Sequence, residues 1–165
     1  TKRLNAICYG VGLGLHQHVS SNSKGTTLMS ALKKSENPEN NPRVKAVFDD
    51  IRATRKTNFI NHLWHYLAFN PDLLEQTWGE VKAVMVADSA LDPLVKEMIY
   101  IAVSATNACA YCVHSHTAAA RAKGMTDDQH ADLLRVVALA AKTNQIANAL
   151  QMPIDTAFDA DQRAS

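Results

Sequence analysis

Two cysteines separated by two residues, Cys109 and Cys112, are the part of this sequence best suited to chemistry. If Cys109 lies in the first turn of a helix that begins near Asn107, then Cys109, Cys112 and His116 fall at positions i, i+3 and i+7, along one face. Two thiols one turn apart can close to a disulfide, and the partial positive charge of a helix N-terminus favours thiolate over thiol. With His116 as proton acceptor or donor, the set predicts a dithiol that exchanges electrons.

Glu97 can join this set only if the chain turns between it and the cysteines. On an unbroken helix, twelve residues at about 100° each would place Glu97 roughly 120° around from Cys109. The turn is expected at Thr106, Asn107 and Ala108, with Thr106 or Asn107 capping the cysteine helix. Glu97 would then face the thiols from the preceding helix and hold or relay a proton. On spacing alone, however, a solvated helix charge is the simpler interpretation of Glu97.

The same segment holds residue types that bind zinc: Cys109, Cys112, His114 and His116. On one helix, His114 falls about 140° from Cys109, so these four side chains cannot converge tetrahedrally. A zinc site shared with His62, His65 or another subunit stays open. A c-type haem would need histidine where Val113 stands. We therefore predict neither a metal nor a cofactor, and two buried structural cysteines remain as an alternative.

The elements that must position these residues are predicted to be helices. Three of them begin with an N-cap residue followed by proline: Asn41-Pro42, Asn70-Pro71 and Asp92-Pro93. Another is expected after Asn58, and the cysteine helix should end near Gly124, at a left-handed position. Thr126 and Gln129 form a capping box for a last long helix, which Pro153 closes. No stretch alternates with period two, so the sequence predicts an all-α domain, an antiparallel bundle of about six helices.

The helix that carries Glu97 has an apolar stripe of its own. Its members are Val95, Met98, Ile99 and Ala102. Their spacing predicts that this side of the helix faces the core.

Composition bounds the class of protein. A chain of 165 residues with 47% hydrophobic and 20% charged residues suits a globular domain. The net charge is only +1, which predicts no nucleic-acid partner, and no apolar run approaches the roughly 20 residues that span a bilayer. Three cysteines, Cys8, Cys109 and Cys112, do not suggest a secreted disulfide framework, so we expect a cytoplasmic protein.

The first 35 residues differ from the rest. Lys2 and Arg3 precede an apolar segment, 6–15, that is interrupted by glycines and lacks a convincing cleavage site for a signal peptide. The polar run 20–25 is typical of a flexible linker. We expect residues 1–35 to be an N-terminal extension or arm, and residues 36–165 to form the helical domain.

The pattern Glu97, eleven residues, Cys109-x-x-Cys112-x-x-x-His116 resembles the alkylhydroperoxidase D-like (AhpD-like) branch of the carboxymuconolactone decarboxylase superfamily. The segment 107–124, N-A-C-A-Y-C-V-H-S-H-T-A-A-A-R-A-K-G, is similar in sequence to the peroxidase-related members of that branch. The likeness covers about Arg43 to Pro153 and includes V-F-D-D-I-R-A-T. A lone C-x-x-C is a weak motif, but its combination with Glu97, His116 and the trailing glycine is specific.

The resemblance implies an AhpD-like helical subunit that assembles as a homotrimer or homohexamer. It implies a peroxidase-type antioxidant dithiol that reduces a small hydroperoxide, or that passes electrons from a dihydrolipoyl protein to a peroxiredoxin partner. Cys109 and Cys112 would be the redox pair, with Glu97 and His116 as the proton relay. The i+4 position of His116 favours Cys112 as the attacking thiolate, whereas helix N-terminal placement favours Cys109.

One position departs from the family pattern. The best-known member type has a second histidine between the cysteines, and this chain has Tyr111 there. The relay would then be shorter and peroxide activity weaker. Tyr111 could instead wall the pocket or donate a hydrogen bond, and His114 is expected at the surface.

Two other functions remain open. One is a lactone decarboxylase like the other branch of the superfamily, although that branch does not rely on a C-x-x-C pair. The other is a non-catalytic helical oligomer whose cysteines sense oxidant.

Overall fold

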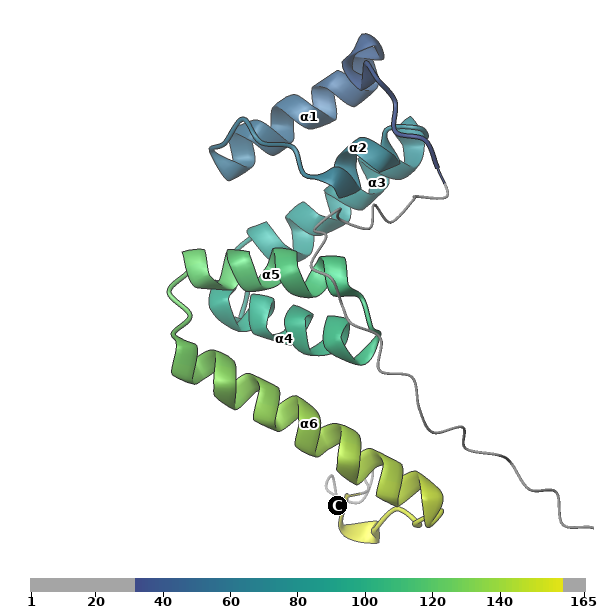
Figure 1. Cartoon of the computed structure of the whole chain (residues 1–165), viewed down its shortest axis with the longest axis vertical. Coiled ribbons are helices and arrows are strands. Elements are labelled where there is room, and N and C mark those ends of the chain that lie inside the picture. The colour runs from purple at the N-terminus through teal and green to yellow at the C-terminus, as the bar shows by residue number, and fades with distance from the viewer. Residues whose placement is uncertain (1–31, 159–165) are drawn as a thin grey trace, which may run out of the picture. The chain divides into compact units, whose positions relative to one another are not determined.

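The computed structural model describes residues 32–158, and its regular elements there are all helical (Figure 1). The chain divides into two units, Thr1–Lys33 and Lys34–Ser165, and every element described below belongs to the second. The expected arm of residues 1–35 falls almost entirely outside the described residues, so its role stays a prediction. In residues 32–158, no helix has the length and apolar character needed to cross a membrane.

Six α-helices follow one another: α1 (Pro42–Arg55), α2 (His62–Leu67), α3 (Pro71–Val81), α4 (Pro93–Thr106), α5 (Ala110–Ala122) and α6 (Asp127–Ala149). Short 3₁₀ turns lie at Pro38–Asn40 and Thr156–Phe158, and a π-helical turn, Lys82–Val86, continues α3. The predicted all-α class with six helices is confirmed for the described part of the chain.

The predicted caps explain where four of these helices begin. The side chains of Asn41, Asn70 and Asp92 each accept a hydrogen bond from a backbone N–H of the first helical turn. Each is followed by a proline at the first helical position, where the missing N–H leaves no gap in the helix. At α6, Thr126 and Gln129 form the reciprocal capping box. These starts are therefore specified locally, before any packing.

The predicted start of the second helix is wrong. α2 begins at His62 with Asn61 at its N-cap, not after Asn58. Ile60 is buried with the core ahead of the helix, which holds the chain extended up to Asn61. The Asn61 side chain caps nothing and instead accepts a hydrogen bond from Arg55 Nη1 at 3.2 Å.

Two clusters of buried side chains hold the helices together. The first joins α1, α2, α3 and the segment before α2: Val44, Val47, Phe48, Ile51, Ile60, Trp64, Leu74 and Trp78. The second joins α4, α5, the turn after α5, and α6: Ile101, Ala120, Met125 and Leu133. Figure 1 shows α4 and α5 as adjacent antiparallel helices, and α4 also contacts α6. The α4–α5 pair carries the residues expected to do chemistry.

The predicted apolar stripe of α4 is only half right. Met98 and Ala102 pack against the second cluster, but Val95 and Ile99 are 40% and 49% exposed. The residues of α4 that are buried are Lys96, Glu97, Ile101 and Ser104. Polar groups can take buried positions when they find partners, and both carboxylate oxygens of Glu97 have one.

Replacing Thr126 with alanine should lower the free energy of unfolding by about 1 kcal/mol, because the Gln129 N–H loses its acceptor at 3.1 Å. The measurement is urea denaturation followed by circular dichroism. Thr143→Ala is the matched control, since Thr143 lies inside α6, where alanine is the better helix former. Equal losses in the two variants would mean that the cap does not stabilise α6.

Candidate active site

A tight turn between α4 and α5 positions the cysteines. α4 ends at Thr106, Asn107 follows as its C-cap, and Ala108 takes the left-handed conformation with φ 54°. The turn is where the sequence predicted it, but the expected cap is wrong. Thr106 still belongs to α4, where its hydroxyl donates to the Ala102 carbonyl, and Cys109 itself is the N-cap of α5.

The two cysteines are free thiols in contact, with their sulfur atoms 2.6 Å apart. The contact with the Cys112 thiol lowers the pKa of Cys109, and so does the hydrogen bond that the Cys109 sulfur accepts from the Cys112 backbone N–H at 3.4 Å. Burial, followed by the neighbouring Cys109 sulfur, raises the pKa of Cys112 to about 11, against a smaller opposing effect of Ser104. The pair is therefore polarised, with the negative charge favoured on Cys109 and the proton on Cys112.

Glu97 is buried between α4 and α5, and both of its carboxylate oxygens have a partner. Its Oε2 lies 2.6 Å from His116 Nδ1, and its Oε1 accepts from Lys123 Nζ at 2.9 Å. Burial raises the pKa of Glu97, but the hydrogen bonds from His116 and Lys123 outweigh it, so the net pKa is lowered. The interpretation of Glu97 as a solvated charge is wrong, because spacing alone does not reveal these two donors.

The ionised carboxylate decides which nitrogen of His116 carries the proton. An ionised carboxylate can only accept hydrogen bonds, so Nδ1 of His116 donates to Glu97. In the neutral imidazole, Nε2 is then left as an acceptor. This is the arrangement of a carboxylate that orients a histidine base.

Three further residues complete the site, and the sequence interpretation missed them. The Tyr100 ring stacks on His116 with centroids 3.6 Å apart, Ser104 is buried beside Cys112, and Lys123 binds Glu97. Tyr100 and Ser104 follow Glu97 by three and seven residues, and Lys123 follows His116 by seven. Helical spacing from the predicted residues could have found all three.

Two hollows reach the cysteines. The larger, about 380 Å³, is lined by Cys109, Cys112 and mainly apolar side chains, among them Val84, Met85, Leu91, Ile99, Tyr100 and Val103. The smaller, about 250 Å³, also includes Cys109, with Ser104, Val113 and His114. Cys109 is therefore reachable from both hollows, while Cys112 lines only the larger one.

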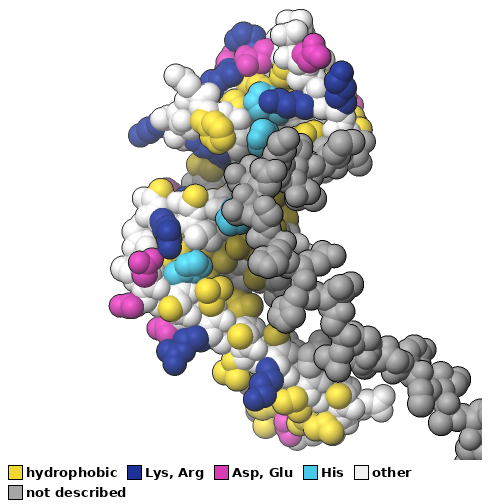
Figure 2. All heavy atoms as spheres, in the orientation of Figure 1, with side chains coloured by type: hydrophobic (Ala, Val, Ile, Leu, Met, Phe, Trp, Pro, Cys, Tyr) yellow, Lys and Arg dark blue, Asp and Glu magenta, His cyan; other side chains and the backbone are white. Residues whose placement is uncertain are grey.

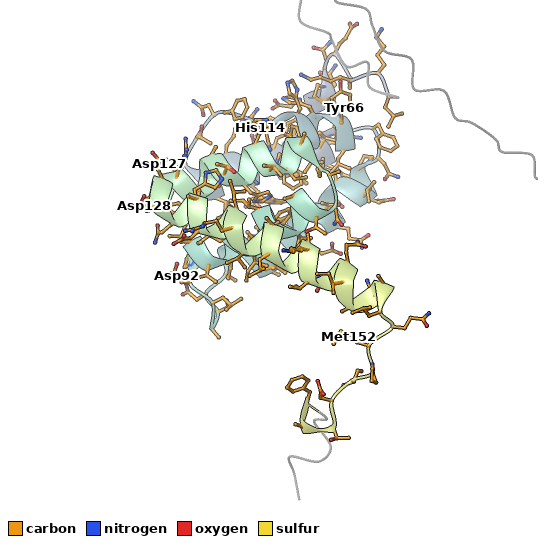
Figure 3. The ribbon with its side chains drawn as sticks, turned by 60° about the horizontal axis from the view of Figure 1, so that its bottom comes forward. Tyr66, Asp92, His114, Asp127, Asp128 and Met152 are labelled. Atoms are coloured by element: carbon orange, nitrogen blue, oxygen red, sulfur yellow. The ribbon has the colours of Figure 1, made fainter. Side chains whose placement is uncertain are left out.

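Tyr111 and His114, both described by the structure, make no hydrogen bond to Glu97 or His116. His114 is exposed on α5, as its helical phase predicted (Figure 3). The Tyr111 hydroxyl accepts a hydrogen bond from the Leu63 backbone N–H at 3.2 Å, so it ties α5 to α2. Of the two roles considered for Tyr111, to wall the pocket or to donate a hydrogen bond, this contact is neither, because the hydroxyl accepts.

The histidines considered as distant zinc ligands lie in α2. His62 is exposed, and the His65 ring is half-buried with its edge against Phe48, centroids 5.2 Å apart. Between residues 32 and 158, the structure brings together no group of three or more histidine, cysteine or acidic side chains that could hold a metal ion.

Residues 71–154 match the model of the carboxymuconolactone decarboxylase family, and this stretch contains all four predicted site residues. The chain belongs to the carboxymuconolactone decarboxylase family. The alkylhydroperoxidase AhpD core from Rhodospirillum rubrum is similar over 79% of this chain and 97% of its own, with 56% identity and a TM-score of 0.76. The predicted AhpD-like fold is thereby confirmed.

A second similar protein matches a shorter part of this chain. The protein named uncharacterized protein 4 in the cox locus of Paracoccus denitrificans is 36% identical over 65 residues, which are 39% of this chain and 59% of that protein. The chain thus spans 59% of the length of the curated relative that it matches.

The polarised pair predicts an order of alkylation. In a Cys8→Ser background at about pH 7.5, iodoacetamide should label Cys109 at least about tenfold faster than Cys112, because the pKa of Cys109 is lowered and that of Cys112 is raised to about 11. Peptide mass spectrometry at successive times measures both rates. Faster labelling of Cys112 would instead support the expectation based on its i+4 spacing from His116.

Proposed function

We propose that this protein is a thiol–disulfide oxidoreductase that reduces hydroperoxides through Cys109 and Cys112. The observation that carries the proposal is the polarised cysteine pair that lines an apolar hollow, together with a Glu97–His116 pair whose carboxylate is buried. The 56% identity to an alkylhydroperoxidase AhpD core supports the same class of reaction. The lactone decarboxylase alternative uses neither cysteine, and no contact in the site favours it.

The reaction takes two steps on the protein. The Cys109 thiolate attacks one peroxide oxygen, the O–O bond breaks, and the departing alkoxide takes a proton and leaves as an alcohol. Cys109 becomes a sulfenic acid. Cys112 then loses its proton, its sulfur bonds to that of Cys109, and water leaves. The dithiol is oxidised by two electrons to a disulfide, and the hydroperoxide is reduced by two electrons.

Glu97 and His116 manage the proton in the second step. Nδ1 of His116 is occupied by Glu97, so its Nε2 is free to take the proton that Cys112 must lose. The Tyr100 ring stacks on His116, and the charges of both cysteines raise the Tyr100 pKa in addition to its burial. This shared neighbour supports placing His116 and the thiols in one site.

A dithiol partner closes the cycle. Thiol–disulfide exchange with a dihydrolipoyl group returns Cys109 and Cys112 to free thiols, and exchange with the disulfide of a peroxiredoxin partner would pass their electrons on. Cys109 is the sulfur open to exchange, because it lines both hollows.

Peroxide turnover with dihydrolipoamide as donor tests the mechanism. Cys109→Ser and Cys112→Ser should abolish turnover, because each removes one sulfur of the disulfide. Glu97→Gln should slow it about 10²-fold or more, since the amide cannot stabilise a protonated His116. Cys8→Ser is the matched control and should retain full turnover. Retained turnover in both single variants of the pair would contradict the dithiol mechanism.

We also propose that the protein is a homo-oligomer, a trimer or hexamer as the family resemblance implies. Of the 23 residues of α6, only Leu133 is buried. Figure 2 shows hydrophobic side chains along the surface of this helix, and those with large exposed areas on one face are Val136, Leu139, Ile146 and Leu150. An exposed apolar face of this kind is typical of a surface covered by another subunit.

Charge on this face should break the assembly. Leu139→Glu, at a position that is 61% exposed, would bury a carboxylate in the interface and should release monomers in light scattering coupled to size exclusion. Asn144→Glu adds the same charge to α6 at an exposed polar position, about 140° around the helix, and should leave the oligomer intact. A wild-type monomer at micromolar concentration would overturn this proposal.

A further inference from the structure

Lys123 binds the carboxylate of the relay without being part of the cysteine–histidine pattern. Its Nζ donates to Glu97 Oε1 at 2.9 Å, while His116 occupies Oε2 at 2.6 Å. The carboxyl is 7% exposed and the Lys123 side chain 36% exposed. The one buried carboxylate of the described residues thus has two partners, one at each oxygen.

The backbone holds Lys123 in place for this contact. Lys123 is the C-cap of α5, and its N–H is hydrogen-bonded to carbonyls of the last turn. Gly124 follows with φ 93° and ends the helix there. His116 and Lys123 are seven residues apart, which is two turns and about 10.5 Å along one face. An ammonium at this end also interacts favourably with the helix dipole.

The other groups near Glu97 do not replace this bond. From α4, Tyr100 stacks on His116 rather than on the carboxylate. From α1, Arg55 attracts Glu97 through space, but its guanidinium lies over the rings of Trp64 and Trp78 and donates to Asn61. Lys123 is therefore the one cation seen to hydrogen-bond directly to Glu97 in residues 32–158.

We propose that Lys123 is a positioning residue that keeps Glu97 ionised and bound to His116 Nδ1, and so sets the lower pH limit of the thiol chemistry. The proposal rests on the proposed function only for its consequence in turnover. With Lys123 present, Glu97 accepts and His116 keeps Nε2 free for a proton. Without it, a buried carboxyl gains a proton more readily and can donate to Nδ1. That moves the histidine proton to Nε2 and removes the base.

The first experiment reads the carboxyl directly. In protein labelled with ¹³C-glutamate, the Glu97 carboxyl, assigned with Glu97→Gln, is followed by NMR as a function of pH. Lys123→Met should raise the Glu97 titration midpoint by about one pH unit or more, because burial then works against a single donor. Lys123→Arg keeps the charge and should titrate like the wild type. Lys142→Met makes the same change at an exposed lysine of α6 and should have no effect.

The second experiment tests whether the loss of Lys123 also changes the pH dependence of the cysteine chemistry. The acid limb of the single-turnover rate at which Cys112 closes the disulfide on oxidised Cys109, where His116 takes its proton, should move to higher pH in Lys123→Met together with the carboxyl midpoint. In the Glu97→Gln background, Lys123→Met should change nothing further, which a merely structural role of the lysine would not predict. Lys123→Gln removes the charge with less loss of volume and should shift the midpoint in the same direction, so it serves if the methionine variant does not fold.

The outcomes separate this proposal from the proposed function. A Glu97 midpoint that stays at the wild-type pH in both neutral variants would overturn the role of Lys123, whether or not peroxide is turned over. A raised midpoint supports that role even if no peroxidase activity is found, because the titration involves no substrate.

Discussion

The burial of one carboxylate constrains the whole α4–α5 pair. Removing an ionised carboxyl from water costs several kcal/mol unless donors replace the lost hydration. Glu97 obtains its donors from a single face of α5, His116 at one oxygen and Lys123 two turns later at the other. Sliding α5 by one turn would leave both oxygens without partners. The two contacts therefore determine the register of α5 against α4, and the dithiol at the start of α5 is placed by the same rigid helix.

The use of a cysteine as a helix cap couples redox chemistry to local structure. N-cap positions are usually filled by serine, threonine, asparagine or aspartate, whose oxygens accept a backbone N–H. Here the Cys109 sulfur accepts from the Cys112 N–H, and a thiolate accepts such a bond better than a neutral sulfur. Ala108 holds the preceding turn at φ 54°, an unfavourable conformation for alanine. The packing of α4 on α5 must offset that strain, so the cap is built by tertiary structure.

The starts of α1, α3, α4 and α6 could be predicted because they depend on local patterns. Asn41, Asn70, Asp92 and Thr126 cap as their residue types predict, with no help from distant parts of the chain. The α4–α5 turn was placed correctly for a different reason, because Glu97 could face the thiols only if the chain turned at this point. The predictions that were wrong concern features that depend on contacts with residues far apart in the sequence. Burial of Ile60 shifts the start of α2, and the buried state of Glu97 requires donors 19 and 26 residues away.

Two interactions connect helices α1 and α2 of the first cluster to the residues of the candidate site. Tyr111, which lies between the two cysteines in sequence, accepts a hydrogen bond from Leu63 of α2 rather than joining the proton relay. The positive charge of Arg55 in α1 attracts Glu97 through space without a hydrogen bond, and its guanidinium lies over two tryptophan rings. Both interactions bear on the electrostatics and rigidity of α5 without touching a reacting sulfur. The α4–α5 pair thus supplies the thiols, the histidine and its carboxylate. Helices α1 and α2 affect the electrostatics and rigidity of this pair but contribute no reacting group.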